Sequence, residues 1–542
     1  MSIKIKFKRM LLFQTALLAA GLLLTAGQQP VAAAGEKLST KIIDGKKNYG
    51  IYASLNKVNQ KKGKKSKKTK KTKKTRKSKK VWKFGRKMAS TKEFKLAHVQ
   101  SQSYKTANGR RYYYVYIDGR GVGYVNEKAF VRSKMSLVKS VSLVNDIVDS
   151  AGFNTDDAIN YVTDKHGSVV DNGLIKKSID RISEEKPGHW LVTYRYGKAY
   201  GKVPVTVRGN AEEGITKASV KPGKGGNVGK TWFPIELAFR GSYSAQFFPH
   251  TYWGTDKKGK KAAKLTTKFY EPNSLSLLAG SEETNVRTNV QGLDVYGQDM
   301  VTTNFYGDSR ASLDNSRGHV ILYHLNKVPT YALQYMPTQT LNFYAWKSYA
   351  ANIKVSPYIK LGHGQSLGST SRYIYELANW NRAQKPRSNE LLQIDKKTMQ
   401  VNRIWTFAVS NGSRKYNRYF LNADVIDDNT VVALFHNKSK QRYEFWKIVR
   451  KGNSFQAKET AAVSGNLISN SSQVQGFTYN VAYKCYYIAF NDYLFKISAE
   501  GNLENFYHFN AKREVEGLAS YKSKIYIAMN KRAEVLDSNM TK

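Results

Sequence analysis

Apolar and aromatic residues along this chain recur in short runs, and turn residues separate one run from the next. One example is the run Tyr112–Ile117, which Asp118-Gly119 separates from the run Val122–Val125. Two such runs around an Asp-Gly turn are typical of a β-hairpin. The same pattern returns along most of the chain. Because about 100–200 residues usually form one domain, the 542 residues predict an all-β protein with several domains.

Residues 1–34 depart from this pattern and resemble a secretory signal peptide. Four basic residues precede an apolar stretch from Leu11 to Ala26, and Ala32-Ala33-Ala34 supplies small residues for cleavage. A membrane anchor is the alternative, but the stretch is short and polar residues interrupt it. No later stretch is long enough to span a membrane, so we expect no transmembrane segment after cleavage near Ala34.

The formal net charge is +49, and basic residues predominate throughout the chain. Such a charge favours polyanionic partners. Cys485 is the single cysteine, which excludes an internal disulfide and a Cys/His zinc site. Export without disulfides favours a Gram-positive bacterium, where teichoic acid or another anionic cell-wall polymer is the expected partner. The signal peptide argues against nucleic acid as the physiological partner. The C-terminus shows no sorting signal, so we expect non-covalent retention on the wall.

The segment 57–80 concentrates the charge, with 15 basic residues and no acidic one. It has no apolar face, so like-charge repulsion predicts a disordered insert. It is either a solubilising loop or an electrostatic tether. In the second case the wall-binding residues include Lys64, Lys65, Lys67, Lys68, Lys73 and Lys74.

Residues 35–130 resemble the GW and bacterial SH3-like modules of Gram-positive surface proteins. The likeness rests on the aromatic run, the Gly-containing turn and Gly123-Tyr124-Val125, which stands where such modules carry Gly-Trp-Val. It implies an SH3-like barrel, with the lysine-rich insert inside it, that binds wall polymers through aromatic side chains. The candidate wall-binding aromatic residues are Tyr114, Tyr116 and Tyr124.

Residues 138–208 contain Val162-Thr163-Asp164 before a turn at Gly167, then Pro187-Gly188 before the strands Trp190–Tyr196 and Val203–Val207. This order resembles bacterial Ig-like surface modules, which implies a sandwich that acts as a spacer. Pro204 within the last predicted strand favours an edge position for that strand. Residues 209–230 then form a Gly-rich linker. Gly229-Lys230-Thr231 superficially matches a phosphate-binding loop, but the earlier glycine and the preceding strand that such a loop requires are missing.

Residues 231–542 contain irregular internal repeats. Several copies open on a polar residue followed by Gly and continue into a hydrophobic strand, a turn and a Tyr-rich strand. The openings lie about 40–70 residues apart, which suits the four-stranded blades of a β-propeller. We count five copies and expect one more within 231–290, which gives five or six blades. The copies begin near Val290, Leu361, Leu421, Val474 and Val515.

In a propeller the first strand of each blade lines a central channel. The polar residues at the openings should therefore converge near its mouth, and Gly on both sides of His363 would allow close approach of a ligand. They form either a shared ligand site or hydrogen bonds between neighbouring blades. The candidate ligand-binding residues are Gln291, His363, Gln475 and Glu516.

Residues 285–535 also resemble helveticin J, a large bacteriocin. The matching features are the His363-Gly364 opening, the Gln475-Gly476 opening and Glu514-Val515-Glu516 before a Tyr-rich strand. The resemblance implies a secreted protein that acts on the envelope of related bacteria.

No established catalytic motif is present, and we predict no metal or cofactor. Glu514 and Glu516 are weak candidates for a catalytic carboxylate pair, because residues two apart on a strand face the same side. The leading hypothesis is a non-enzymatic, secreted protein that is retained on the cell wall and binds anionic wall polymers or glycans. A helveticin-like bacteriocin and a wall glycan hydrolase are the alternatives.

Overall fold

The structure is a computed structural model, and Leu38–Lys542 form one compact unit. The described residues are 38–59, 80–94, 98–117, 120–145, 152–209, 219–222, 249–271, 290–306, 317–327, 352–357, 359–379, 388–411, 416–465, 467–468, 473–530 and 533–538. Three predictions fall wholly or mostly outside them: the signal peptide, the lysine-rich insert and the Gly-rich linker. The described residues are almost entirely β, with short 3₁₀ turns, and contain no helix long and apolar enough to cross a membrane.

The first sheet has six antiparallel strands in the order β1-β6-β7-β8-β2-β5. Val99, Val115 and Val125 are fully buried at its centre. Ile117 pairs with Arg120, which confirms the predicted hairpin between the two aromatic runs. Whether this sheet is an SH3-like module stays a prediction. Its strands are β1 (Ser39–Ile42), β2 (Gly50–Tyr52), β5 (Lys87–Ser90), β6 (His98–Ala107), β7 (Arg110–Ile117) and β8 (Arg120–Asn126).

A separate hairpin carries the lysine-rich insert. Strands β3 (Leu55–Asn59) and β4 (Lys80–Phe84) pair from Leu55–Phe84 to Asn59–Lys80. The two ends of the predicted insert, Lys57 and Lys80, therefore lie on strands, and the disordered region predicted over 57–80 is too long at both ends. The described hairpin ends at the Asn59–Lys80 pair, and residues 60–79 lie outside the described residues.

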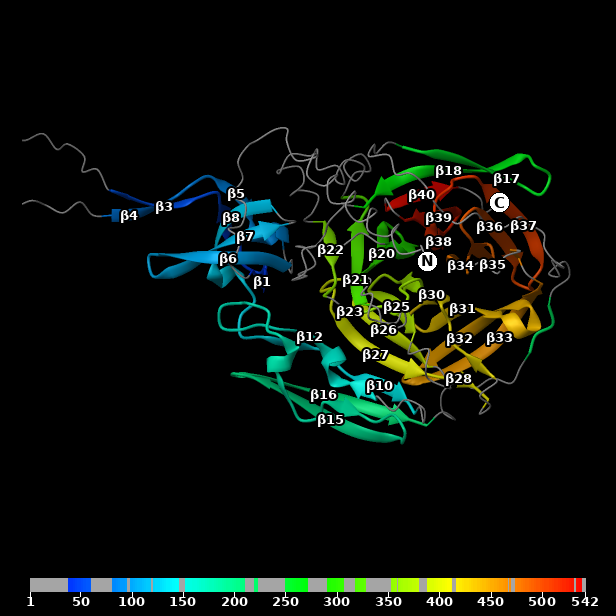
Figure 1. Cartoon of the computed structure of the whole chain (residues 1–542), viewed down its shortest axis with the longest axis horizontal. Helices are drawn as coiled ribbons and strands as arrows, with labels where there is room; N and C mark the ends of the chain where they lie inside the picture. Colours follow the sequence, from blue (N-terminus) through cyan, green and yellow to red (C-terminus); the bar gives the residue numbers. More distant parts are fainter. Residues whose placement is uncertain are drawn as a thin grey trace, which may run out of the picture. The chain divides into compact units, whose positions relative to one another are not determined.

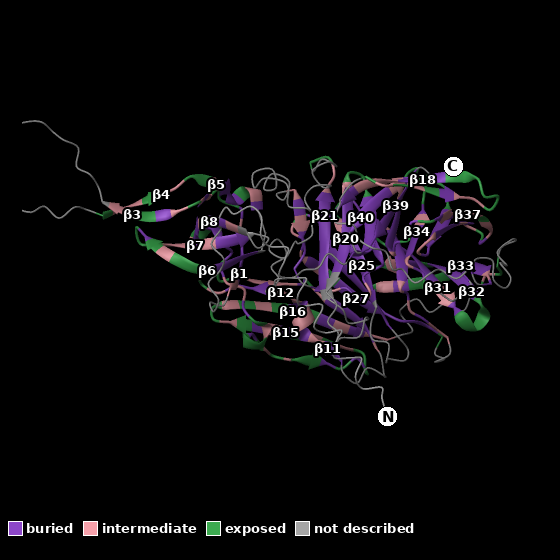
Figure 2. Ribbon diagram, turned by 45° about the horizontal axis from the view of Figure 1, so that its top comes forward, coloured by how far each residue is buried: buried purple, intermediate pink, exposed green. Residues whose placement is uncertain are grey.

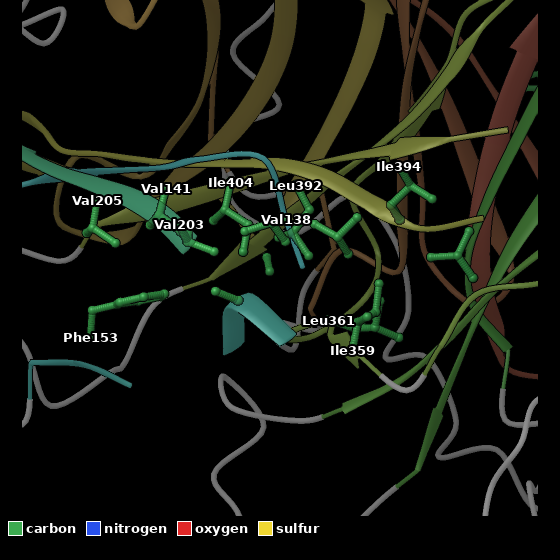
Figure 3. Packing of buried hydrophobic residues seen from close by; sticks show 14 of the residues in the cluster. Val138, Val141, Phe153, Val203, Val205, Ile359, Leu361, Leu392, Ile394 and Ile404 are labelled. Atoms are coloured by element: carbon green, nitrogen blue, oxygen red, sulfur yellow. The ribbon is translucent and has the colours of Figure 1, made fainter. Parts of the chain in front are cut away.

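Residues 135–208 continue the sheet of a later part of the chain. Strand β10 runs parallel to β16 on one side and to β27 on the other, where Val141 lies opposite both Val205 and Ile404. The eight-stranded sheet has the order β13-β15-β16-β10-β27-β26-β25-β24. Figure 3 shows the shared core, where Val141 and Val203 lie beside Leu392 and Ile404. The Ig-like assignment stays a prediction, but the edge position expected from Pro204 is wrong, because β16 lies between β15 and β10.

The elements of this region are short until its final hairpin. They are β9 (Met135–Leu137), β10 (Val141–Val144), β11 (Phe153–Asn154), η3 (Thr155–Ala158), β12 (Ile159–Val162), η4 (Asn172–Leu174), β13 (Lys176–Lys177), β14 (Arg181–Ile182), β15 (Gly188–Tyr196) and β16 (Ala199–Arg208).

Within the described residues, the C-terminal repeats form a closed ring of five blade-like sheets, and the last two of these are continuous with each other. The first strands of the sheets contact one another in cyclic order, β19 to β24, β30, β34, β38 and back to β19. This arrangement is β-propeller-like. Figure 2 shows that β20, β25 and β40 are buried along most of their lengths, as expected for sheets that pack face to face around an axis.

The first three sheets follow chain order. The first contains β19 (Val290–Tyr296), β20 (Asp299–Tyr306), β21 (Arg317–His324), β22 (Ile353–Val355) and β23 (Ile359–Lys360). The second contains β24 (Leu367–Ser369), β25 (Tyr373–Asn379), β26 (Asn389–Asp395) and β27 (Val401–Phe407). A small hairpin, β28 (Val409–Ser410) and β29 (Asn417–Arg418), precedes the third, which contains β30 (Asn422–Asp427), β31 (Thr430–Asn437), β32 (Arg442–Lys451) and β33 (Ser454–Ser464).

A hairpin from earlier in the chain joins the last two of these sheets into one nine-stranded sheet. The fourth contains β34 (Gly476–Asn480), β35 (Cys485–Ala489), β36 (Tyr493–Ser498) and β37 (Leu503–Phe509), and the fifth contains β38 (Val515–Tyr521), β39 (Lys524–Met529) and β40 (Glu534–Ser538). The hairpin is β17 (Thr251–Thr255) and β18 (Lys261–Tyr270), and it pairs with β37 and β40. Figure 1 shows β18 (green) beside β40 (red).

The described ring has five blades, one of the two numbers that were expected. We expected a further repeat within 231–290, but the described part of that range supplies outer strands to existing sheets. Strand β18 becomes the fourth strand of the fifth sheet, so an early segment closes the ring onto the C-terminal strands. The first and last described strands of residues 231–542 therefore belong to one sheet.

Candidate functional site

The glycines that open the repeats allow the inner strands to approach one another closely. A Cβ atom built on Gly476 would lie 2.6 Å from Leu518 Cβ, and one on Gly517 would lie 2.9 Å from Leu293 Cβ. Carbon atoms in contact normally stay about 3.5–4.0 Å apart. The glycines after Gln291, Gln475 and Glu516 therefore have a structural reason, which is the narrow spacing of the strands around the axis.

The polar residues before three of these glycines meet at one mouth of the ring. Gln365 Nε2 donates to Gln475 Oε1 and to Glu516 Oε2, each at 3.3 Å. Asn530 Nδ2 donates to Glu516 Oε1 at 3.2 Å, and Gln291 also hydrogen-bonds Glu516. The structure thus brings Gln291, Gln475 and Glu516 together as expected, with Gln365 at the centre. We call Gln291, Gln365, Gln475 and Glu516 the mouth cluster.

Glu516 is the electrostatically unusual member of the mouth cluster. Burial, and then the neighbouring Glu514 carboxylate, raise the pKa of Glu516 to about 8. A carboxyl group that is protonated at neutral pH beside a second carboxyl is a feature of glycoside hydrolases. Both oxygens of Glu516 are already hydrogen-bonded to Asn530 and Gln365, however. The arrangement is that of an interblade hydrogen-bond network, and ligand binding by these residues stays a prediction.

A second polar layer lies further along the inner strands. Ser369 Oγ on β24 donates to Asp294 on β19, and Thr478 Oγ1 on β34 donates to Asp424 Oδ2 on β30 at 2.7 Å. Burial raises the pKa of both carboxyl groups, and the proximity of Asp294 raises that of Asp424 further. The sequence analysis missed this layer. Its one signal is that Asp294 and Thr478 each stand three residues after a polar residue that opens a repeat.

His363 lies beside the mouth cluster and lines a pocket. The pocket has a volume of about 310 Å³, and Gln365 belongs to both the pocket and the mouth cluster. It lies where the segments before β24 and β34 meet β30 and β31. The lining residues are His363, Gln365, Tyr419, Leu421, Asn422, Leu434, Phe435, His436, Lys438, Gln473 and Val474.

On the first sheet, two of the three predicted wall-binding tyrosines retain exposed surface. The Tyr114 and Tyr124 rings lie 5.0 Å apart, and both are partly exposed. Tyr116 is only 9% exposed and its hydroxyl donates to Gln102, so it packs within the sheet, and its contact with a polymer stays a prediction. The six predicted wall-binding lysines of segment 57–80 lie outside the described residues.

Cationic side chains lie over aromatic rings on the same sheet and on the β3–β4 hairpin. Lys105 Nζ is 4.8 Å from the centre of the Tyr124 ring, and the Arg111 guanidinium is 4.6 Å from that of Tyr104. Lys57 Nζ is 6.0 Å from the Trp82 ring. Such pairs are attractive in themselves, and they also hold positive charge next to flat apolar surface.

No group of three or more His, Cys, Asp or Glu side chains suited to a metal ion occurs among the described residues.

No family model matches the sequence, and no curated protein matches it. Solved structures show distant likeness. A glutaminyl cyclase from Myxococcus xanthus has a TM-score of 0.26 and 12% identity, covering 46% of this chain and 90% of its own. A gluconolactonase from Xanthomonas campestris has a TM-score of 0.25 and 8% identity, covering 57% of this chain and 98% of its own. The Cps50 (Swd1) β-propeller domain from Myceliophteria thermophila has a TM-score of 0.22 and 11% identity, covering 45% of this chain and 62% of its own. Likeness this distant carries no argument about function.

Proposed function

We propose that this is a secreted protein, held non-covalently on anionic cell-wall polymers through residues 35–130, whose propeller-like ring presents a binding surface. The observation that carries the proposal is the cluster of cation–aromatic pairs on the first sheet and the β3–β4 hairpin. Lys57, Lys105 and Arg111 each lie against an aromatic ring there. In the sequence, residues 60–79 of the lysine-rich segment connect the two strands of that same hairpin.

This arrangement suits a flexible polyanion. The lysine-rich segment supplies long-range attraction, which acts over about 8–10 Å at moderate salt. The aromatic side chains supply short-range contacts with the apolar parts of a polymer, and the adjacent cations contact its charged groups. The attraction by the lysine-rich segment and the contacts by the aromatic surface come from different residues, so variants can test each contribution alone.

Extraction of the protein from intact cells with increasing salt tests the proposal. The full chain should be released progressively as salt screens the charges. A variant in which residues 60–79 are replaced by a Gly/Ser segment of equal length should be released at lower salt, and the equal length keeps the hairpin connection unchanged. Retention of that variant at high salt to the same extent as the full chain would contradict the electrostatic attachment.

The raised pKa of Glu516 beside Glu514 favours one second candidate, a glycan hydrolase. The test is release of soluble sugar fragments from purified walls by the full chain and by Glu516→Gln. We expect no release by either protein, because Gln365 and Asn530 already occupy the two oxygens of Glu516. If the full chain releases sugar fragments and Glu516→Gln does not, the ring is catalytic, and the proposal that it only binds is wrong.

A further inference from the structure

Two residues that line the pocket beside the mouth cluster each have a buried polar atom that no protein group satisfies. Asn422 is 6% exposed, and its amide nitrogen donates to Val474 O at 3.4 Å, while its Oδ1 has no donor. The Nε2 atom of His436, which is also buried, has no partner. A buried polar atom without a hydrogen bond costs roughly 1–3 kcal/mol. Two of them in one pocket indicate a ligand that can bond to both.

The chemistry of these two atoms limits the ligand. Asn422 Oδ1 only accepts, so the ligand must donate a hydrogen bond there. Burial, and then the charge of Lys438, lower the pKa of His436 to about 4, so the imidazole is neutral at ordinary pH. Its ring also stacks on Tyr443 with 4.3 Å between ring centres, which fixes its orientation. A hydroxyl group donates and accepts, and it therefore matches both atoms, whereas an anionic oxygen would repel Asn422 Oδ1.

The remaining walls of the pocket are apolar and aromatic. The rings of Tyr419 and Phe435 lie edge to face with 6.0 Å between their centres, and both side chains are partly exposed. Leu421, Leu434 and Val474 complete these walls. Aromatic faces beside a few fixed polar groups are the usual composition of a small-molecule site. They suit the flat C–H face of a sugar ring, whose hydroxyl groups point outward around its edge.

Lys438 is the one Lys, Arg, Asp or Glu among the described residues that line the pocket. Arg418, whose guanidinium lies 4.5 Å from the centre of the Phe435 ring, is paired with Glu444. Lys438 is exposed at the start of the 3₁₀ turn η8 (Lys438–Lys440), whereas Gln365, Asn422 and the neutral His436 line the interior. A charged substituent on a ligand would therefore find its counter-ion only outside the pocket. The interior favours an uncharged ring.

We infer that this pocket binds a single uncharged pyranose ring, stacked on Tyr419, with hydroxyl groups bonded to Asn422 Oδ1 and His436 Nε2. The volume of about 310 Å³ accommodates one ring and its substituents. The site goes beyond the proposed attachment to wall polymers and does not depend on residues 35–130. It gives the propeller-like ring its own ligand, which is a terminal or single neutral sugar.

Titration of the purified full chain with methyl glycosides of neutral hexoses and of N-acetylhexosamines tests this, with binding followed by NMR or calorimetry. We expect at least one glycoside to bind saturably. Tyr419→Ala and Asn422→Leu should each weaken binding about tenfold or more, equivalent to about 1.4 kcal/mol. Tyr419→Phe keeps the aromatic face and should retain the affinity. Lys440→Ala, which alters an exposed cation outside the pocket, is the matched surface control.

Three outcomes would overturn the inference. They are the absence of saturable binding by every glycoside, binding that neither Tyr419→Ala nor Asn422→Leu weakens, and tighter binding of inorganic phosphate or the open-chain polyol sorbitol at this site. Binding of each variant to an anionic wall polymer is measured in parallel. Because that interaction is assigned to residues 35–130, loss of sugar binding with unchanged polymer binding separates failure of this site from failure of the proposed function.

Discussion

Gly517 shows how a residue that looked like part of a ligand motif has a packing role. The sequence repeats a polar residue followed by glycine, and the glycine lies where a neighbouring inner strand leaves no room for a side chain. The polar residue before it reaches the mouth of the ring. Sequence spacing was sufficient to predict the convergence of Gln291, Gln475 and Glu516, because each precedes such a glycine.

The same reasoning selected the wrong residue of the second repeat for the mouth cluster. His363 was selected because glycines flank it, but Gln365, two residues later, occupies the centre of the mouth cluster. Gly362 and Gly364 have positive φ angles of 57° and 75°, so the chain turns there before β24 begins. The sequence marks the turn, but it does not indicate which side chain after the turn points to the axis.

Gly517→Ala tests the close approach of the inner strands. The added methyl group would collide with Leu293, so we expect a loss of about 1–3 kcal/mol in the free energy of unfolding. Chemical denaturation measures it. Gly209→Ala is the control, because a Cβ built there meets nothing within 4 Å. Equal stability of the two variants would show that the inner strands have more room than the structure gives them.

Glu516→Gln tests the buried carboxyl group. Its pKa is raised to about 8, so between about pH 4.5 and 8 the folded protein keeps a proton that the unfolded chain has lost. The free energy of unfolding must therefore fall as pH rises through that window. The amide resembles the protonated acid and cannot lose a proton. We expect the variant to gain stability relative to the native protein, by roughly 2–4 kcal/mol between pH 5 and pH 8.

Urea denaturation at pH 5, 6.5 and 8 provides the measurement. Glu185→Gln, at an exposed position, controls for the loss of one negative charge. A difference between Glu516→Gln and the native protein that stays constant with pH would mean that Glu516 is ionised in the folded state, contrary to its burial.

At the scale of elements, the pattern of strands and turns was predictable and the partners of the strands were not. Alternation and turn residues indicate where a strand begins and ends. They do not indicate that β18 pairs with β40, more than 260 residues later, or that β10 inserts between β16 and β27. Such pairings depend on which sheet edges remain open after the local hairpins have formed.

Pro204 illustrates the limit. Proline lacks the N–H group that a central strand donates, so an edge position was expected for its strand. The strand β16 is nevertheless internal, and its pairing with β10 begins at Val205, immediately after the proline. No β10 residue lies opposite Pro204, so the missing N–H group of the proline leaves no β10 partner unpaired. The expectation is correct for this residue but wrong for the strand as a whole.

An engineered disulfide tests the closure of the ring by β18. Thr266 lies directly opposite Asp537, and their side chains are hydrogen-bonded at 3.3 Å. Thr266→Cys combined with Asp537→Cys should therefore form a disulfide on oxidation and raise stability by about 2–4 kcal/mol. Mass spectrometry detects the bond. Thr266→Cys with Ser538→Cys is offset by one residue, so its side chains face opposite sides of the sheet and should stay reduced. Crosslinking of the offset pair alone would contradict the register.

At the scale of the whole molecule, the features behind the two proposals lie in different parts of the chain. The lysine-rich segment and the cation–aromatic pairs belong to residues 35–130, whereas the mouth cluster and the pocket belong to the ring. The strong net positive charge was evident from composition, and so was the predicted preference for polyanions. The pocket that we infer to bind a sugar was not, because Tyr419, Asn422 and His436 come from separate parts of the chain that only the packing around the third sheet brings together.

Salt-dependent binding of the purified protein to an isolated anionic wall polymer tests the central claim most directly. The affinity of the full chain should fall steeply as salt rises from about 0.05 to 0.5 M, because the Debye length shortens over that range. The chain with Gly/Ser in place of residues 60–79 should bind more weakly and depend less on salt. An affinity that is independent of salt and unchanged by that replacement would contradict electrostatic retention on the wall.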